Sequence, residues 1–363
     1  MNILIRADAS LEMGIGHVMR CLTLADGLRS AGGQIDFVCR EHPGHFAEII
    51  RSRGYAVHLL PMGRSEAGAL AHSAWLGGNQ ADDAAAVADL ARAKRPDWLI
   101  VDHYGLDITW ERTLRPFAEK IMVVDDLADR NHDCDVLLDQ NLGRSPQSYE
   151  HRVPEDTVIL AGSAYALLRP EFARYRAEAR ARRRESSPAT LLIALGGVDQ
   201  GNLTGRTLAA LARGGLPDDM EIVVVLGPTA PWREAVANQA AAMPMPTRVI
   251  EHSQDMARLM SEADAAIGAA GSTAWERCCL GLPTMMWILA DNQRVVADAL
   301  VAAGAAATIE MASNDRTIET ELTAFLRDGA RLAEMSRCAA ALVDGRGVER
   351  VMNAMGVVDG IAA

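Results

Sequence analysis

The sequence predicts an α/β protein with two Rossmann-like domains. Short apolar runs alternate with segments of helical periodicity along the whole chain. The apolar runs are almost continuously hydrophobic, which is typical of parallel strands that helices cover on both faces. This alternation stops at a polar helix predicted over 170–185, followed by Ser186, Ser187 and Pro188, and then starts again. A second strand–helix series after a linker predicts a second domain of the same class.

We therefore expect an N-terminal domain at 1–168, a linker helix at 169–188 and a C-terminal domain at 189–345. The carboxyl ends of the two parallel sheets are expected to face a central cleft, because open α/β sheets bind ligands at those ends. The last segment, 346–363, contains a helix at about 348–355 that has no partner in this scheme and is a candidate to pack back on the first domain. A chain of 363 residues is long enough for two cores.

Each element is predicted from its own pattern, strands from short apolar runs and helices from apolar residues three or four apart. In the first half the expected strands are 2–7, 35–39, 56–60, 98–102, 121–125, 136–139 and 158–161, and the expected helices are 17–31, 43–53, 81–94 and 109–118. In the second half the expected strands are 191–195, 222–226, 248–251, 265–267, 284–288 and 307–309. The helices between them are expected at 203–212, 232–243, 255–262, 273–280, 292–303 and 318–326.

Composition restricts the class of protein. Hydrophobic residues make up 49% and charged residues 23%, as in soluble globular proteins, and no segment is long and apolar enough to span a bilayer. The N-terminal sequence reaches Asp8 too early for a signal-peptide core, which favours a cytoplasmic protein without a membrane partner. A net charge of −12 argues against nucleic acid as the main partner but allows a local nucleotide site. The oligomeric state stays open, with a monomer favoured.

The cysteines and histidines do not form a metal-binding pattern. The six cysteines show neither C-x-x-C nor zinc spacing, so we expect them to be reduced and mostly buried. His42 and His45 are the only close histidine pair and lack the carboxylate of an H-E-x-x-H site. Asp125 and Asp126 are neighbours at a strand end, where their side chains point to opposite faces, which disfavours joint ligation. The sequence therefore predicts no metal and no other cofactor.

The first candidate site is a glycine loop between the first strand and the first helix. Gly14 and Gly16 let the backbone pass close to a ligand, and the start of the next helix presents N–H groups that attract phosphate. His17 lies where the loop becomes helix, and the positive end of the helix dipole disfavours its imidazolium, so it could accept a proton. Met19 replaces the third glycine of G-x-G-x-x-G, which disfavours NAD. A phosphate loop and an ordinary tight turn are both consistent with this pattern.

Two further strand–helix junctions carry glycines. Gly196 and Gly197 end one strand, and Asn202 is a plausible N-cap of the helix that follows. This junction suits a second ligand loop and simple turn chemistry about equally.

The other junction has a more specific pattern. A buried strand leaves through Gly268 and Gly271, and Ser272 or Thr273 is expected to cap the next helix. Glycine, hydroxyl and helix start together suit a diphosphate. Glu276 falls on the first turn of that helix, where a carboxylate suits a ribose diol, although it would also stabilise the helix N-terminus by itself.

Polar residues follow two other strands. Asn292 and Gln293 would contribute to a good N-cap cluster, or would hydrogen-bond sugar hydroxyls or N-acetyl groups. Asp102, His103 and Tyr104 end a strand in the first half, and one of them is expected to face the cleft. His103 by itself is more typical of a structural histidine.

Taken in order, these blocks resemble those of a known family. They are Arg6-x-Asp8, Gly14-x-Gly-His17-x-x-Arg20-Cys-Leu, Trp75-Leu-Gly, Val101-Asp-His-Tyr104, Asp125-Asp-Leu-Ala-Asp-Arg130, Tyr165-Ala-Leu-Leu-Arg-Pro-Glu-Phe172, Gly196-Gly-Val-Asp199 with Asn202, Gly268-Ala-Ala-Gly-Ser-Thr-Ala-Trp-Glu276 with Cys-Cys-Leu-Gly-Leu-Pro283, and Ala290-Asp-Asn-Gln293. The family they resemble is that of the UDP-2,4-diacetamido-2,4,6-trideoxy-β-L-altropyranose hydrolases of pseudaminic acid biosynthesis, relatives of the MurG-like GT-B glycosyltransferases. The resemblance covers nearly the whole chain, except the tail beyond about 345.

The resemblance implies a GT-B-like fold and the hydrolysis of a UDP-sugar at its anomeric carbon, with inversion and without metal, to UDP and 2,4-diacetamido-2,4,6-trideoxy-L-altrose. It implies His17 as the general base that activates water and Tyr104 as a residue that helps to orient the reacting groups. It places UDP on the second domain. The residues expected around the substrate are Asp8, Gly14, Gly16, Arg20, Gly196, Gly197, Asn202, Gly271, Ser272, Thr273, Glu276, Asn292 and Gln293.

Three other functions stay open. A glycosyltransferase of the same fold would pass the sugar to an acceptor, although the first domain lacks a basic, apolar patch for membrane docking, since Arg51 and Arg53 are too few. A hydrolysing UDP-N-acetylhexosamine 2-epimerase would need acids for proton abstraction, and Asp8 or Asp102 could serve. A non-catalytic nucleotide-sugar-binding module would bind UDP without turnover. NMR analysis of the products separates hydrolysis from epimerisation.

Overall fold

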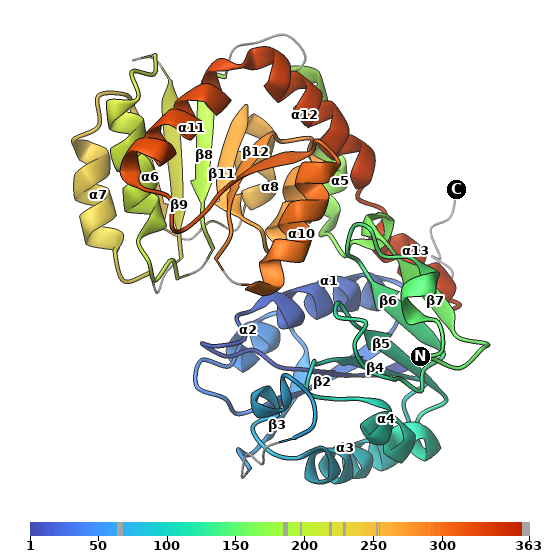
Figure 1. The fold of residues 1–363 in the computed structure, drawn as a ribbon. Coiled ribbons are helices and arrows are strands. Elements are labelled where there is room, and N and C mark those ends of the chain that lie inside the picture. The colour runs from blue at the N-terminus through green and yellow to red at the C-terminus, as the bar shows by residue number, and fades with distance from the viewer. Residues whose placement is uncertain are drawn as a thin grey trace. The chain divides into compact units, whose positions relative to one another are not determined.

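The structure is a computed structural model that describes residues 1–63, 68–183, 188–196, 198–217, 220–227, 230–251, 253, 255–289 and 291–357. Within these ranges the chain forms two compact units (Figure 1). The first unit contains residues 1–168 and the segment from Arg346 onward, and the second contains Arg169–Gly345. Each unit is built around one parallel sheet. In the described ranges, no helix is long and apolar enough to cross a membrane.

The first unit has a seven-stranded sheet with the strand order β3-β2-β1-β4-β5-β6-β7. The strands are β1 (Asn2–Ala7), β2 (Gln34–Arg40), β3 (Ala56–Leu60), β4 (Trp98–Asp102), β5 (Lys120–Val124), β6 (Val136–Asp139) and β7 (Val158–Ala161). Neighbouring strands are parallel throughout, and β1 pairs with β4 so that Ala7 lies opposite Asp102. The carboxyl ends of β1 and β4 therefore lie side by side.

The helices of this unit are α1 (Gly16–Ser30), α2 (Ala47–Ser52), α3 (Gln80–Lys94), α4 (Ile108–Leu114) and α13 (Gly347–Ala354), with the short 3-10 helices η1 (Ser73–Leu76), η2 (Arg115–Phe117), η3 (Pro146–Tyr149) and η4 (Ser163–Tyr165). The helix expected over 43–53 begins only at Ala47, because Gly44 adopts a φ of +77°, which a right-handed helix does not allow. The helix expected over 109–118 ends at Leu114, where the chain tightens into η2 around Pro116, a residue without an N–H for an α-helical bond.

The C-terminal helix α13 packs on α1. A Cβ on Gly27 of α1 would lie 2.7 Å from the Val348 side chain and 2.9 Å from that of Met352, so only glycine allows this close approach. Val351, Met352 and Met355 join the core of the first unit. The helix that has no partner in the sequence scheme therefore belongs to the first unit.

The second unit has a six-stranded parallel sheet with the order β10-β9-β8-β11-β12-β13. Its strands are β8 (Thr190–Ala194), β9 (Glu221–Leu226), β10 (Thr247–Glu251), β11 (Ala265–Ala269), β12 (Thr284–Trp287) and β13 (Ala306–Ile309). Its helices are α5 (Pro170–Arg182), α6 (Leu203–Arg213), α7 (Arg233–Ala241), α8 (Met256–Glu262), α9 (Thr273–Cys279), α10 (Asp291–Ala302), α11 (Asp315–Arg327) and α12 (Gly329–Leu342). The sequence scheme misses α12. No strand separates it from α11, and Asp328 both ends α11 and caps α12 by accepting from the Arg331 N–H.

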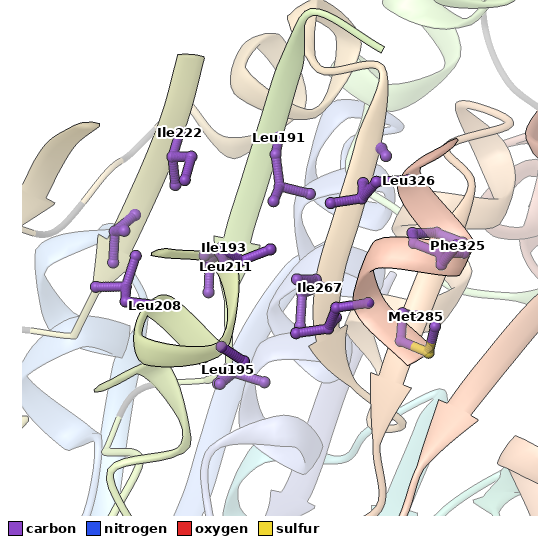
Figure 2. Packing of buried hydrophobic residues seen from close by; sticks show 14 of the residues in the cluster. Leu191, Ile193, Leu195, Leu208, Leu211, Ile222, Ile267, Met285, Phe325 and Leu326 are labelled. Atoms are coloured by element: carbon purple, nitrogen blue, oxygen red, sulfur yellow. The ribbon is translucent and has the colours of Figure 1, made fainter. Parts of the chain in front are cut away.

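Figure 2 shows how the second unit buries one face of its sheet. Leu191 and Ile193 of β8 and Ile267 of β11 are buried side chains of this core, and Phe325 of α11 and Leu211 of α6 pack in the same cluster. This burial is the main favourable contribution to folding and gives the loops that follow the strands a rigid base.

Each sheet has one place where the strand order reverses. In the first unit the chain builds β2 and β3 on one side of β1 and then places β4 on the other side. In the second unit β9 and β10 lie on one side of β8, and β11 lies on the other. Ligands of open α/β sheets bind beyond the carboxyl ends of the strands at such a reversal. The loops after β1, β4, β8 and β11 are therefore the places to search for a site.

Candidate active site

His17 and Asp102 form a histidine–carboxylate pair at the strand reversal of the first unit. His17 is the second residue of α1, Asp102 is the last residue of β4, and the His17 Nδ1 lies 2.6 Å from the Asp102 Oδ1. The Asp102 side chain is fully buried, whereas the His17 side chain is 10% exposed. With the Nδ1 proton donated to the carboxylate, Nε2 keeps its lone pair and can accept a proton. In the described part of the chain no group hydrogen-bonds to Nε2.

Arg20 lies one turn further along α1 and neutralises this carboxylate. Its Nε donates to the Asp102 Oδ2 and its Nη2 to the Asp102 Oδ1, each at 2.6 Å. The same Nη2 lies 3.3 Å from the His17 Nδ1, but a lone pair on Nδ1 would face a carboxylate oxygen at 2.6 Å, so Nδ1 carries the proton. Burial by itself would raise the pKa of Asp102, and Arg20 and His17 hold that pKa well below its usual range. Asp102 is therefore ionised at neutral pH.

Tyr104 follows β4 and contacts both Asp126, a partner of Arg20, and His17. Its hydroxyl donates to the Asp126 Oδ2 at 2.5 Å, and the Arg20 Nη1 donates to the same oxygen at 2.5 Å. Burial and the Asp126 charge raise the pKa of Tyr104 well above its usual value, so the phenol stays neutral. Its ring meets the His17 ring edge to face, with centroids 4.6 Å apart. Tyr104 can therefore restrict the position of the imidazole but does not act as a base.

The glycine loop after β1 forms a compact turn. Gly14 has a φ of +76° and donates its N–H to the Ser10 carbonyl at 2.9 Å, while the Ser10 hydroxyl accepts from the Met13 N–H at 3.0 Å. Gly16 is the first residue of α1, and Ile15 at the N-cap makes no side-chain hydrogen bond. The helix that carries His17 therefore begins without a side-chain cap.

Asp8, expected at the substrate, lies inside a buried charge network. Its Oδ1 accepts from the Arg6 Nη1 at 2.5 Å and from the Arg40 backbone N–H at 2.6 Å, and its side chain is fully buried. Burial would raise the pKa of Asp8, but Arg6 holds it well below its usual range. His103, whose Nε2 lies 3.4 Å from the Asp8 Oδ2, is also buried. These contacts speak for a structural role of Asp8 in holding β1 against β2.

The start of α9 in the second unit differs from its expectation in one respect. Ser272 is the N-cap residue but makes no side-chain capping hydrogen bond, and the Thr273 Oγ1 accepts from the Arg277 Nη1 at 3.0 Å. Ser272 therefore occupies the N-cap position, as expected, but its hydroxyl does not make the capping hydrogen bond. Gln293 of α10 lies beside this loop, since a Cβ on Gly271 would be 3.9 Å from its Nε2.

The guanidinium of Arg277 explains why Gly268 is a glycine. The Arg277 Nη2 donates to the Ala269 carbonyl at 2.6 Å, and a Cβ on Gly268 would lie 2.6 Å from the Arg277 Nη1. Burial lowers the pKa of Arg277 to about 10, so it still carries its charge at neutral pH. The sequence pattern gives no sign of this buried cation beneath the loop.

Glu276 lies on the first turn of α9, and its side chain is 18% exposed. Burial raises its pKa to about 7, although Arg169, whose Nη2 lies 3.6 Å from the Glu276 Oε1, opposes this shift. A carboxyl with a pKa in this range can accept or donate a hydrogen bond near neutral pH, which suits a hydroxyl-bearing ligand.

The polar side chains of the loop after β8 hydrogen-bond to the start of the helix that follows, α6. The Asn202 Oδ1 accepts from the Gly205 N–H at 3.1 Å, which confirms Asn202 as the N-cap of α6. The Asp199 carboxylate accepts from the Leu203 and Thr204 N–H groups, each at 2.9 Å. The amides at the start of α6 are thus already paired, which favours simple turn chemistry here.

The remaining predicted residues have these places. Gly196 lies two residues after the end of β8 with a φ of +92°, and Gly197 lies outside the described residues. Asn292 is in the first turn of α10, and its side chain lies outside the description. Within the described ranges, no group of three or more histidine, cysteine, aspartate and glutamate side chains is arranged to hold a metal ion.

The structure thus gathers the predicted residues into two groups, one on each unit. His17, Arg20 and Tyr104 meet at the end of β4, while Gly271, Ser272, Thr273, Glu276 and Gln293 meet at the start of α9. The sequence analysis missed Asp126 as the partner of Tyr104. It named Asp102 among three residues of which one faces the cleft, and as an acid for an alternative reaction, but not as the partner of His17. Asp102 ends β4 and Asp126 follows β5, and the pairing of β4 with β1 and β5 is the information that places them beside α1.

Comparison with protein families gives one match. Residues 200–351 match the glycosyltransferase family 28 C-terminal domain. This region contains most of the second unit, including the loop at Gly271 and helix α9.

Three curated proteins are distant relatives. A protein of Methanocaldococcus jannaschii of uncharacterised function is 26% identical over 81% of this chain, and the match spans only 57% of that relative's length. The spore coat polysaccharide biosynthesis protein SpsG of Bacillus subtilis is 25% identical over 97% of this chain and 96% of its own. The UDP-2,4-diacetamido-2,4,6-trideoxy-beta-L-altropyranose hydrolase of Campylobacter jejuni is 26% identical over 77% of this chain and 89% of its own.

Solved structures of the same architecture are also similar. MurG of Acinetobacter baumannii superimposes with a TM-score of 0.71 at 17% identity, over 98% of this chain and 99% of MurG. The UDP-GlcNAc 2-epimerase of Neisseria meningitidis, solved with UDP-GlcNAc, gives a TM-score of 0.62 at 10% identity, over 98% and 99% of the two chains. At these identities the likeness concerns the fold. The chain has a GT-B-like fold, as the sequence predicts, and distant relatives among nucleotide-sugar proteins.

Proposed function

We propose that the protein hydrolyses a UDP-sugar at the anomeric C–O bond and releases UDP and the free sugar. The observation that carries this proposal is the His17–Asp102 pair. A carboxylate neutralised by Arg20 holds the Nδ1 proton of His17, and Nε2 is left to accept a proton. This arrangement suits a general base that activates water.

In the proposed reaction, His17 Nε2 takes a proton from a water molecule as the water oxygen attacks the anomeric carbon. The bond between that carbon and the UDP oxygen breaks, and its electron pair leaves with UDP. Attack from the face opposite UDP inverts the anomeric configuration. A nucleoside diphosphate is a good leaving group, so the reaction needs no second carboxylic acid. It also needs no metal as long as the protein supplies hydrogen bonds to the diphosphate.

We assign UDP to the second unit. Glu276 is proposed to bind the ribose hydroxyls, and Ser272, Thr273 and Gln293 are proposed to lie near the diphosphate. The match to the glycosyltransferase family 28 C-terminal domain over residues 200–351 supports this assignment. The Neisseria meningitidis epimerase, a fold relative solved with UDP-GlcNAc, supports a UDP-sugar as the ligand.

For the sugar we propose 2,4-diacetamido-2,4,6-trideoxy-L-altrose, in pseudaminic acid biosynthesis. The support is the Campylobacter jejuni relative, which is named for the hydrolysis of the corresponding UDP-sugar and matches 77% of this chain. The test is incubation of the purified protein with UDP-2,4-diacetamido-2,4,6-trideoxy-β-L-altropyranose, without acceptor and with a chelator, while the anomeric signals are followed by proton NMR. Release of UDP and the inverted free sugar supports the proposal, and binding of UDP without release of sugar contradicts it.

A glycosyltransferase is the second candidate function, because the matching family model is that of a glycosyltransferase domain. The two reactions differ only in whether water or an acceptor hydroxyl gives its proton to His17. In the NMR experiment a transferase would leave the UDP-sugar intact until an acceptor is added. Recovery of the starting UDP-sugar without acceptor therefore favours the transferase.

A further inference from the structure

Three aromatic side chains lie beside the His17–Asp102 pair, and two of them, His72 and Trp75, have no part in the proposed chemistry of water activation. The Trp75 ring stacks on that of Tyr104 with an interplanar angle of 25° and centroids 5.9 Å apart. His72 packs against both, with centroid distances of 4.4 Å to Trp75 and 5.5 Å to Tyr104. All three side chains are half-buried. We call His72, Trp75 and Tyr104 the aromatic platform.

The fold does not depend on Trp75 to anchor its segment. The next residue, Leu76, is 1% exposed and packs in the core of the first unit. Gly77 approaches the His42 ring so closely that a Cβ would lie 2.7 Å from it. By contrast, the Trp75 Nε1 donates to the exposed carboxylate of Glu12 at 3.3 Å. Because Leu76 anchors the segment and the Trp75 indole is only half-buried, the indole ring can contact a ligand.

The platform is uncharged at neutral pH. Burial lowers the pKa of His72 from its ordinary value, so its imidazole is neutral. Burial and Asp126 raise the pKa of Tyr104, so its phenol keeps its proton. Neutral aromatic faces favour C–H groups and methyl groups over charged or strongly hydrated ones.

We propose that this platform binds the C–H face and methyl substituents of the sugar ring, and that Trp75 determines specificity for such sugars. The inference rests on the proposed function. A water molecule that lies within about 3 Å of His17 Nε2 and attacks from about 3 Å brings the anomeric carbon to within about 6 Å of that nitrogen. The Tyr104 centroid lies 4.6 Å from the His17 centroid, so a pyranose ring at this position reaches the platform.

The chemistry of the proposed substrate agrees with this surface. A 2,4-diacetamido-2,4,6-trideoxy sugar carries three methyl groups and has hydrogen in place of the 6-hydroxyl. Apolar groups gain free energy when they leave water, whereas a hydroxyl on the same surface would lose its hydration without a partner. The platform therefore favours the deoxy, acetylated sugar over a sugar rich in hydroxyls.

The test compares wild-type protein with three variants, Trp75→Ala, Trp75→Leu and Trp75→Phe. Trp75→Leu keeps apolar volume without an aromatic face, and Trp75→Phe keeps an aromatic face without the bond to Glu12. Steady-state kinetics with the diacetamido UDP-sugar give kcat and KM separately, and calorimetry gives the dissociation constant of UDP alone. Urea unfolding shows that each variant is folded, and Trp75→Leu replaces Trp75→Ala if the alanine variant is not.

We expect Trp75→Ala and Trp75→Leu to raise KM about tenfold while kcat stays within about threefold of wild type. Trp75→Phe is expected to keep KM within about threefold, and UDP alone is expected to bind all variants equally. An unchanged KM in Trp75→Ala, or an equal loss of affinity for UDP, overturns the proposal.

Failure of the proposed function is a separate outcome. If the wild-type protein does not hydrolyse the UDP-sugar, calorimetry with the intact UDP-sugar replaces KM. Tenfold weaker binding of the UDP-sugar by Trp75→Ala, with UDP binding unchanged, then supports the platform although hydrolysis is refuted. Equal binding by wild type and variant overturns the platform in that case too.

Discussion

Replacement of Asp102 by asparagine tests the proposed general base through its hydrogen-bond partner. Both carboxylate oxygens of Asp102 accept bonds, Oδ1 from His17 and Arg20 at 2.6 Å each and Oδ2 from Arg20 at 2.6 Å. An amide group presents one NH2 in place of an oxygen, and in either orientation this NH2 faces a donor. If it faces His17, the imidazole accepts at Nδ1, and the proton moves to Nε2. The nitrogen proposed to take the proton from water is then already protonated.

The size of the effect follows from these contacts. General-base assistance is worth about 100- to 10,000-fold in rate, so kcat of Asp102→Asn should fall by that factor. Loss of charge-assisted bonds to a buried arginine should also cost about 2–4 kcal/mol of the free energy of unfolding, because among the described residues Arg20 keeps only Asp126 as an ionised partner. UDP affinity should stay unchanged, since the proposed UDP site is on the second unit.

The assay is UDP release from the diacetamido UDP-sugar, with urea unfolding and UDP calorimetry on the same preparations. Asp89→Asn is the matched control, because it makes the same chemical change at an exposed carboxylate that pairs only with Arg92 in the described chain. We expect the control to behave as wild type. A folded Asp102→Asn variant with kcat within about threefold of wild type would refute the mechanism.

Three further variants address the two units separately. His17→Asn should lose about 100- to 10,000-fold in kcat while it still binds UDP, and near-normal turnover, measured by NMR, would exclude His17 as the base. The folded-state pKa of Glu276 of about 7 exceeds its ordinary value of 4.5, so its contribution to stability is complete below pH 4.5 and disappears as the pH rises to 7. Relative to Glu276→Gln, wild type should therefore lose about 3 kcal/mol between pH 4.5 and 8 in urea unfolding, and parallel pH profiles would contradict the shift. Gly268→Ala should lower the free energy of unfolding by about 1–3 kcal/mol and weaken UDP binding, because its Cβ displaces the buried Arg277 guanidinium. An unchanged urea midpoint would show that the guanidinium moves aside without loss of stability.

Much of the fold follows from the sequence because buried parallel strands consist of continuous runs of apolar residues. The strands expected at 2–7 and 98–102 coincide with β1 and β4. The ends of two helices were harder to predict from the sequence. Local backbone geometry at Gly44 and Pro116 determines these ends, and the apolar periodicity does not. The helix α12 was missed because it follows α11 directly and breaks the alternation of strand and helix on which the scheme depends.

The candidate site was predictable where residues are close in sequence. His17 and Arg20 are one turn apart on the same helix, so their spacing already places them together. Their partners Asp102 and Asp126 are 82 or more residues away, and only the strand order brings them to α1. Trp75 belongs to a block of the family resemblance, but the sequence did not place it beside the His17–Asp102 pair, because the position of a 3-10 segment relative to a sheet edge is set by tertiary packing.

The charges at the two strand reversals differ, and this difference fits the proposed division between catalysis in the first unit and UDP binding in the second. In the first unit Asp102 and Asp126 are paired with Arg20, so the proposed base His17 lies next to neutralised charge. In the second unit burial raises the pKa of Glu276 towards neutrality, against the opposing charges of Arg169 and Arg277, which leaves it free to exchange hydrogen bonds with a ligand. Lesions at the His17–Asp102 pair should therefore lower kcat, and lesions at Glu276 should weaken UDP binding. A variant of Glu276 that lowered kcat with unchanged UDP affinity would contradict this division.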